Sequence, residues 1–244
     1  MHSTAIKAFI IHLDRATDRL GQVRELTSQL PVATEIIDAV DGRMLDPTEM
    51  QRVYRRHLHK PHYPFALSAN EIACFLSHRQ AWQAIVDRDL AAGLVLEDDV
   101  ALNEDFPAAL ATALAYLQPD HFIRLPFRPE REHGPELFKA GNACIIKPAP
   151  VGLGMVAQLV GREAAKRLLS ATEQLDRPVD TTLQMNWVTG VVPLSVHPGG
   201  VREVSAHLGG STIKQHRSML DRFVHEILRP LYRMKVKHTS HKQH

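Results

Sequence analysis

The sequence has little cysteine, almost no net charge and no long uncharged run. Cys74 and Cys144 are the only cysteines among 244 residues, too few for a disulfide-built scaffold. A net charge of +2 with 44% hydrophobic residues excludes a disordered polyelectrolyte. The longest stretch without Asp, Glu, Lys or Arg, residues 181–201, contains prolines and amides that lipid would not tolerate. Because charges return at Asp14, too early for a signal peptide, we expect a soluble cytoplasmic protein with free thiols.

The small net charge conceals an asymmetry. Residues 214–244 hold eight Lys and Arg against two acids, a surplus of +6 that leaves −4 for residues 1–213. Apolar residues between Met219 and Leu231 recur at helical spacing, which predicts a basic amphipathic helix. Such a helix binds an anionic membrane surface or packs on the rest of the protein, and the pattern leaves both open. Nucleic acid is not an expected partner, because the segment lacks interleaved aromatic residues.

Short apolar runs alternate with amphipathic segments, without an internal repeat or a Gly/Ser linker, which predicts an α/β fold. We expect one domain over residues 1–213, followed by the basic tail over residues 214–244. Strands are expected at 8–13, 35–40, 94–96, 121–125, 144–146, 155–160 and 191–196. Helices are expected at 18–30, 47–57, 68–89 and 106–117, and from residues 162 and 178 onward. Residues 126–142, rich in Pro, Gly and charge, are expected to form a loop.

Three consecutive acids, Glu97, Asp98 and Asp99, follow the buried strand at 94–96. Open α/β sheets bind ligands at the carboxyl ends of their strands. Adjacent carboxylates repel one another, and a hard divalent cation such as Mg²⁺ or Mn²⁺, shared with substrate phosphates, relieves that repulsion. The alternative is that the acids merely begin the next helix, and the tripeptide alone leaves both open.

Two arginines follow the first strand. Arg15 and Arg19 are four residues apart, so on a helix both guanidinium groups could meet a diphosphate. Alternatively they belong to a solvated helix start and pair with Asp14 and Asp18. No G-x-G-x-x-G follows this strand, which disfavours a dinucleotide-binding enzyme.

A third group of candidates lies on the helix expected from residue 68. Ser68 and Glu71 have the spacing of a capping box. Glu71, Phe75, His78 and Trp82 share one helical stripe, which either lines a pocket or is core.

Polar residues near the end of the apolar pattern offer further chemistry. Asp180, which follows Pro178, is either a helix-capping residue or a general base. His197 and His207 flank a Gly-rich turn, and either could ligate a metal.

The order of the motifs points to a family. The segments FIIHLDRATDRL, DAVDG, LSANEIACFLSHRQAWQAIV and GLVLEDDVAL resemble, in this order, glycosyltransferase family 25 of lipooligosaccharide biosynthesis. The resemblance continues through AQLVGREAAKRLL, PVD and SAHLGGSTI and covers about residues 5–213. It implies a GT-A-like nucleotide-sugar-binding fold with a mostly parallel central sheet. It also implies inverting transfer of a sugar from a UDP-sugar, often UDP-galactose, to a surface glycan or glycolipid.

The resemblance also assigns roles to residues. Asp99 would bind Mn²⁺ (or Mg²⁺) directly, Glu97 would assist through water, and Asp98 would contact ribose or sugar hydroxyls. His207 is a further candidate metal ligand, and Asp180 is the candidate catalytic base. The candidate donor-binding positions, besides Asp98, are Leu13, Asp14, Arg15, Arg19, Asp41, Gly42, Glu71, Ser77 and His78.

Four positions depart from the family pattern. His12 replaces an Asn, Ala73 a Gly, Gln158 an aromatic residue and Glu203 a Gln, which leaves the donor sugar open. Two other functions compete with a metal-dependent glycosyltransferase. One is a non-catalytic protein of the same fold that binds a nucleotide-sugar or glycan; the other is a Mg²⁺ enzyme acting on phosphates, such as a nucleotidyltransferase.

Overall fold

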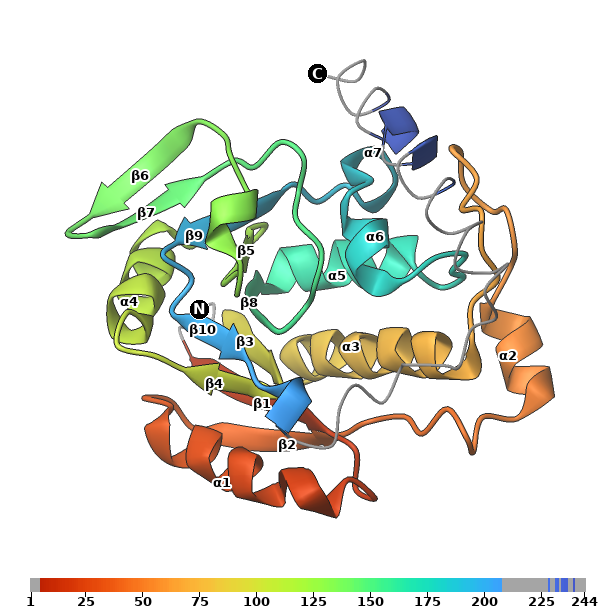
Figure 1. Cartoon of the computed structure of the whole chain (residues 1–244), viewed down its shortest axis with the longest axis horizontal. Coiled ribbons are helices and arrows are strands. Elements are labelled where there is room, and N and C mark those ends of the chain that lie inside the picture. Colours follow the sequence, from red (N-terminus) through yellow and green to blue (C-terminus); the bar gives the residue numbers. More distant parts are fainter. Residues whose placement is uncertain (1–4, 208–227, 229–230, 233, 237–238, 240–244) are drawn as a thin grey trace.

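The computed structural model describes residues 5–207, 228, 231–232, 234–236 and 239 (Figure 1). The strands are β1 (Ile6–His12), β2 (Thr34–Asp38), β3 (Ala92–Glu97), β4 (Val100–Leu102), β5 (Phe122–Arg124), β6 (Glu136–Ala140), β7 (Ala143–Ile146), β8 (Ala157–Gly161), β9 (Pro193–His197) and β10 (Val201–Glu203). The helices are α1 (Leu20–Gln29), α2 (Pro47–Val53), α3 (Ala69–Asp87), α4 (Phe106–Tyr116), α5 (Arg162–Ala171), α6 (Val179–Leu183) and α7 (Asn186–Thr189). Short 3₁₀ turns cover Thr17–Arg19, Pro129–Arg131 and Ser205–His207.

The central sheet is mixed, so the prediction of a mostly parallel sheet is wrong. Its eight strands run in the order β2-β1-β3-β8-β5-β9-β7-β6. Strand β1 is parallel to β2 and β3, and β5 is parallel to β9. Strand β8 lies antiparallel between β3 and β5, and β7 is antiparallel to both β9 and β6. The alternation of strands and helices predicts the α/β class but not the direction in which β8 enters the sheet.

Alternate residues of the central strands enter two separate cores. On β1, Ala8 and Ile10 belong to the core cluster that contains apolar residues of α1 and α4. Phe9 and Ile11 belong to the cluster on the opposite face, with apolar residues of α3 and α5. The sheet therefore lies between two helical layers and is buried on both faces, which explains the continuous apolar runs of β1 and β3.

Helix α3 begins as the sequence predicts. Ser68 accepts from the backbone N–H of Glu71, and the Glu71 carboxylate accepts from the backbone N–H of Ser68, so the predicted capping box is confirmed. Trp82 and Phe75 are fully buried in the second core, so this face holds the helix against the sheet.

The prediction of a loop over residues 126–142 is wrong. Residues 126–142 contain a 3₁₀ turn and β6, which pairs with β7 in a hairpin at one end of the sheet (Figure 1). Strand β6 is an edge strand with exposed residues, so its composition shows no apolar run. The short strands β4 and β10, which pair antiparallel outside the main sheet, also lack an alternating pattern long enough to detect.

The C-terminal segment is described at few positions. Most of the helix predicted from Met219 lies outside the described residues. Tyr232 and Val236 are buried against Tyr63. In the part of the chain that the structure describes, no helix has the length and apolar character needed to cross a membrane.

Candidate active site

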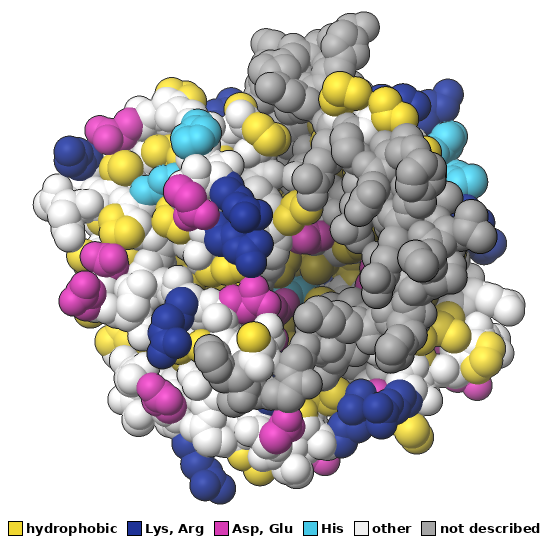
Figure 2. All heavy atoms as spheres, in the orientation of Figure 1, with side chains coloured by type: hydrophobic (Ala, Val, Ile, Leu, Met, Phe, Trp, Pro, Cys, Tyr) yellow, Lys and Arg dark blue, Asp and Glu magenta, His cyan; other side chains and the backbone are white. Residues whose placement is uncertain are grey.

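A cavity of about 450 Å³ opens where the parallel strands β1 and β3 end. Its wall is built from those strand ends, the turn after β2, the first turns of α3, the segment before β8, and α6. On the face drawn in Figure 2 the molecule is hollowed near its centre, with acidic side chains at the margin of the hollow. The cavity thus has the position that open α/β sheets give to their ligands.

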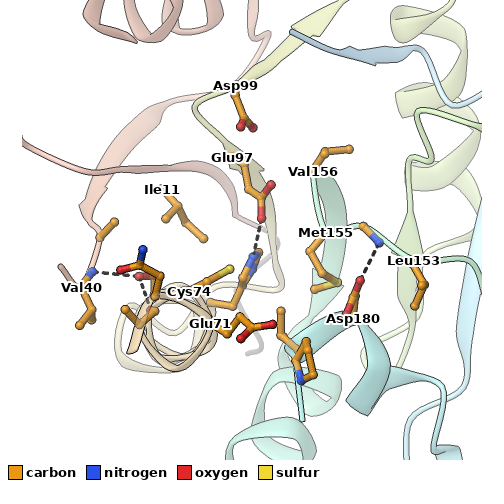
Figure 3. A pocket seen from close by; sticks show the side chains of 18 of the residues that line it. Ile11, Val40, Glu71, Cys74, Glu97, Asp99, Leu153, Met155, Val156 and Asp180 are labelled. Atoms are coloured by element: carbon orange, nitrogen blue, oxygen red, sulfur yellow. Dashed lines mark hydrogen bonds and ion pairs between the residues drawn. The ribbon is translucent and has the colours of Figure 1, made fainter. Parts of the chain in front are cut away.

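Glu97 and Asp99 both line this cavity (Figure 3). Glu97 ends β3, and Asp99 follows in the tight turn before β4. The Asp99 side chain is 15% exposed, and its Oδ1 atom is buried without a hydrogen-bond partner among the described residues. Burial and the neighbouring Glu97 carboxylate raise the pKa of Asp99 to about 7. The turn therefore concentrates negative charge that only a proton or a cation relieves.

Asp98 also lines the cavity, and its carboxylate belongs to a buried network. Its Oδ1 atom accepts from Arg19 Nη1 at 2.5 Å, and its Oδ2 atom lies 2.7 Å from His12 Nδ1. The same Arg19 nitrogen lies 3.3 Å from Asp99 Oδ2. Arg19 is 5% exposed and linked to the acidic turn, so it does not belong to a solvated helix start. His12, one of the departures from the family pattern, is the second partner of Asp98.

The turns after β1 and β2 form one side of the cavity. Leu13, Arg15 and Gly42 line it, whereas Asp14 is exposed and does not. Asp41 accepts from Arg15 Nε at 2.6 Å, a bond that lowers the pKa of the Asp41 carboxyl. The bond between Arg15 and Asp41 therefore joins the two predicted donor-binding turns to each other.

Helix α3 contributes Glu71, Ser77 and His78 to the cavity wall. Ser77 accepts from the backbone N–H of Val40 at 2.9 Å and donates to the Ala73 carbonyl, so it fixes the turn after β2 to the helix. His78 Nε2 lies 3.1 Å from Glu97 Oε1, and its Nδ1 lies 3.3 Å from Gln158 Nε2. The helix stripe is thus part core and part cavity wall.

Asp180 lines the cavity from α6. Its Oδ2 accepts from the backbone N–H of Gly154 and its Oδ1 from the Thr181 hydroxyl, each at 3.1 Å. Arg124 donates to the carbonyl oxygens of Leu153 and Gly154, and it forms a buried ion pair with Glu132. This buried support, which no sequence pattern predicts, holds the segment that positions Asp180.

Several further residues that line the cavity are not among those predicted from the sequence. Cys74, one turn before His78 on α3, faces the cavity, and the spacing of four is a signal that could have identified it (Figure 3). Tyr63 and Tyr232 line the cavity and contact each other edge to face, with ring centroids 5.3 Å apart. The Tyr232 hydroxyl accepts from the fully buried Arg177 at 2.5 Å. No local pattern links these residues.

The structure bears on one of the two histidines that are candidate metal ligands, because only the His197 side chain is described. His207 ends the 3₁₀ turn after β10, and its side chain lies outside what the structure describes. His197 ends β9 and does not line the cavity. Burial lowers the pKa of His197.

The residues at the acidic turn fit a hard divalent cation. The buried Asp99 Oδ1 atom has no partner among the described residues, and Glu97 offers further carboxylate oxygen beside it. Carboxylate oxygens are the ligands that Mg²⁺ and Mn²⁺ prefer. These residues thus satisfy the donor chemistry of the predicted ion.

Gly42 lies against the start of α3, which gives a prediction. A Cβ atom there would lie 2.3 Å from Asn70 Oδ1 and 2.8 Å from Asn70 N. Gly42→Ala should therefore displace the turn after β2 and raise the KM for the donor, with a loss of about 1–3 kcal/mol in stability. The control is Gly21→Ala, because a Cβ at Gly21 meets nothing within 4 Å. Equal KM values and equal unfolding free energies for the two variants would refute the prediction.

Comparison with known proteins decides the family. The model of "Glycosyltransferase family 25 (LPS biosynthesis protein)" matches residues 5–183. The chain belongs to glycosyltransferase family 25. The resemblance that the motifs predict is thereby confirmed.

The names of similar proteins in glycosyltransferase family 25 include both inactive members and galactosyltransferases. "Probable inactive glycosyltransferase 25 family member 3" of Bos taurus is 30% identical over 183 residues, which covers 69% of this chain and 31% of that protein. "Procollagen galactosyltransferase 2" of Homo sapiens is 32% identical over 105 residues, covering 42% and 17% respectively. The chain thus spans about a third or less of the length of these curated relatives.

Solved structures show only distant similarity. A Drosophila β-1,4-galactosyltransferase 7 mutant in complex with manganese, UDP-Gal and xylobiose is 12% identical, with a TM-score of 0.43. The match covers 89% of this chain and 78% of that one. Similarity at this level carries no functional argument.

Proposed function

We propose that this family 25 chain is a metal-dependent inverting glycosyltransferase that moves a hexose from a UDP-sugar to a lipooligosaccharide or another surface glycan. The observation that carries the proposal is the buried, unpartnered oxygen of Asp99, beside Glu97, on a cavity of about 450 Å³. The names of the galactosyltransferase relatives favour galactose or another hexose as the transferred sugar.

The donor would bind with its diphosphate at the acidic turn. Glu97 and Asp99 would hold a divalent cation, which neutralises the charge that develops on the departing diphosphate. With both of its oxygens engaged by Arg19 and His12, Asp98 contributes by fixing the turn that presents Asp99. The turns at Arg15 and Gly42, fixed to each other and to α3, form the wall for the nucleotide.

Asp180 is the proposed general base. It removes the proton from the attacking acceptor hydroxyl, whose oxygen then bonds to the anomeric carbon. The bond from that carbon to the diphosphate oxygen breaks, and its electron pair leaves with UDP. The Gly154 N–H and the Thr181 hydroxyl hold the Asp180 carboxylate in place for this step.

A screen of UDP-sugars with Mn²⁺ and glycan acceptors, followed by UDP release, tests the proposal. We expect Asp180→Asn to lower kcat by about 10²–10⁴-fold while the affinity for UDP is unchanged, because the amide cannot accept the proton. The control is Glu173→Gln, because Glu173 is exposed and does not line the cavity. Full turnover by Asp180→Asn would exclude it as the base.

Two other functions are outcomes of the same assay. The inactive relatives favour a non-catalytic nucleotide-sugar-binding protein, which would bind UDP in calorimetry without turnover. A nucleotidyltransferase would release pyrophosphate in place of UDP. The proposed cytoplasmic location rests on the few cysteines and the early return of charge at Asp14. The proposed contact with an anionic membrane rests on the basic charge of residues 214–244.

A further inference from the structure

A thiol, an imidazole and a carboxylate meet on the cavity wall. One ligand atom each from Cys74, His78 and Glu97 lies within 4.8 Å of the other two. Among the residues that the structure describes, no other group of three or more His, Cys, Asp and Glu side chains has its ligand atoms within this distance of one another. It is chemically distinct from the all-oxygen pair of Glu97 and Asp99, although it shares Glu97.

The local structure explains the cluster. Cys74 and His78 are four residues apart on α3 and so lie on the same face, and that face packs against β3, which ends at Glu97. The distance of 3.1 Å from His78 Nε2 to Glu97 Oε1 is close to the spacing of about 3.3–3.6 Å between neighbouring ligands of a tetrahedral Zn²⁺ ion. The half-buried Cys74 thiol needs to approach by only roughly 1 Å, which side-chain rotation provides.

Gln158 supplies a second, independent observation. It is fully buried behind His78, its Nε2 lies 3.3 Å from His78 Nδ1, and its Oε1 has no partner among the residues described. In this arrangement the amide donates to Nδ1, so the ring proton is on Nε2 and faces Glu97. A metal on Nε2 would move that proton to Nδ1, and the rotated Gln158 amide would then accept it through Oε1. Metal binding at Nε2 would thus give the buried oxygen a partner.

The donor set identifies the ion. Sulfur, imidazole and carboxylate ligands together are typical of Zn²⁺, whereas Mg²⁺ and Mn²⁺ prefer oxygen alone. The cavity leaves a position open for water and provides the route of entry, because Cys74, His78 and Glu97 all line it. We propose that Cys74, His78 and Glu97 form a Zn²⁺ site, and that zinc bound there inhibits transfer by withdrawing Glu97 from Asp99. The inhibition rests on the proposed function; the binding does not.

Binding is tested on the metal-free full chain with Cd²⁺ and Zn²⁺. Cd²⁺ bound to a thiolate absorbs in the ultraviolet, which distinguishes this site from adventitious binding by the other histidines. We expect the band in the wild type and in Cys144→Ser, the matched control, and its loss in Cys74→Ser. Cys74→Ser should also weaken calorimetric Zn²⁺ binding at least about tenfold, and Gln158→Leu should weaken it while keeping the band. Thermal unfolding checks that each variant is folded.

The outcomes separate the two proposals. A wild type without the band, or a band that persists in Cys74→Ser, overturns the zinc site even if transfer is observed. A Cys74-dependent band without UDP release from any donor leaves the zinc site standing and refutes the proposed function. Asp99→Asn should bind Zn²⁺ as the wild type does, and where transfer occurs, Zn²⁺ should inhibit it less in Cys74→Ser.

Discussion

Asp99→Asn is expected to lower Mn²⁺-dependent UDP release by at least about 10³-fold, since loss of a metal ligand removes several kcal/mol of transition-state stabilisation. The amide keeps the size of the side chain and removes its charge. The control is Glu104→Gln, an exposed acid that follows β4 and does not line the cavity. Full metal-dependent turnover by Asp99→Asn would exclude Asp99 as a metal ligand.

The same substitution is expected to change the pH dependence of stability. Burial beside Glu97 raises the pKa of Asp99 to about 7, against an ordinary value of 3.8. Between these two pH values the folded chain holds a proton that the unfolded chain releases, so metal-free stability falls as pH rises through this range. Asp99→Asn removes that contribution. The decrease in Tm from pH 4 to pH 8 in chelator should therefore be smaller in the variant than in the wild type.

Arg19→Met is expected to destabilise the fold by about 3–5 kcal/mol, because it leaves the buried Asp98 carboxylate without its guanidinium partner. Adding Asp98→Asn should restore part of this loss, since the uncompensated charge is then removed. Unfolding in urea gives the free energies for the cycle.

Arg15→Met is the matched control. Arg15 also bonds to an aspartate, but its side chain is 35% exposed, and exposed ion pairs contribute about 0–1 kcal/mol. Equal losses in Arg15→Met and Arg19→Met would show that the buried network around Asp98 does not stabilise the fold.

Local patterns predict much of the fold. The apolar run at β1, the capping box of α3 and the acids after β3 each depend on neighbours in sequence, and all three form as predicted. The direction of β8 and the β6–β7 hairpin depend on contacts between distant segments, so local patterns do not reveal them.

The candidate site shows the same division. The sequence motifs indicate Glu97, Asp99 and Asp180 as site residues, and in the structure all three line one cavity. The partners that restrain the acidic turn and Asp180 come from elsewhere in the chain. His12 at the end of β1 and Arg19 in the following 3₁₀ turn hold Asp98, and Gly154 holds Asp180. An arginine near a helix start has the same local pattern whether it faces solvent or a buried acid.

Tyr232 forms part of the cavity wall, so the order of synthesis determines when the cavity can be completed. Glu97, Asp99 and Asp180 all leave the ribosome before Tyr232 does, so the carboxylates are synthesised ahead of one side of the cavity that they line. Tyr232 is then secured by Arg177, which is itself held between Asp176 and the carbonyl oxygens of His59 and Pro61. Enclosure of the site is thus a late event in biogenesis. Proteolytic removal of the segment that carries Tyr232 would abolish that enclosure and leave every acidic side chain of the site in the chain.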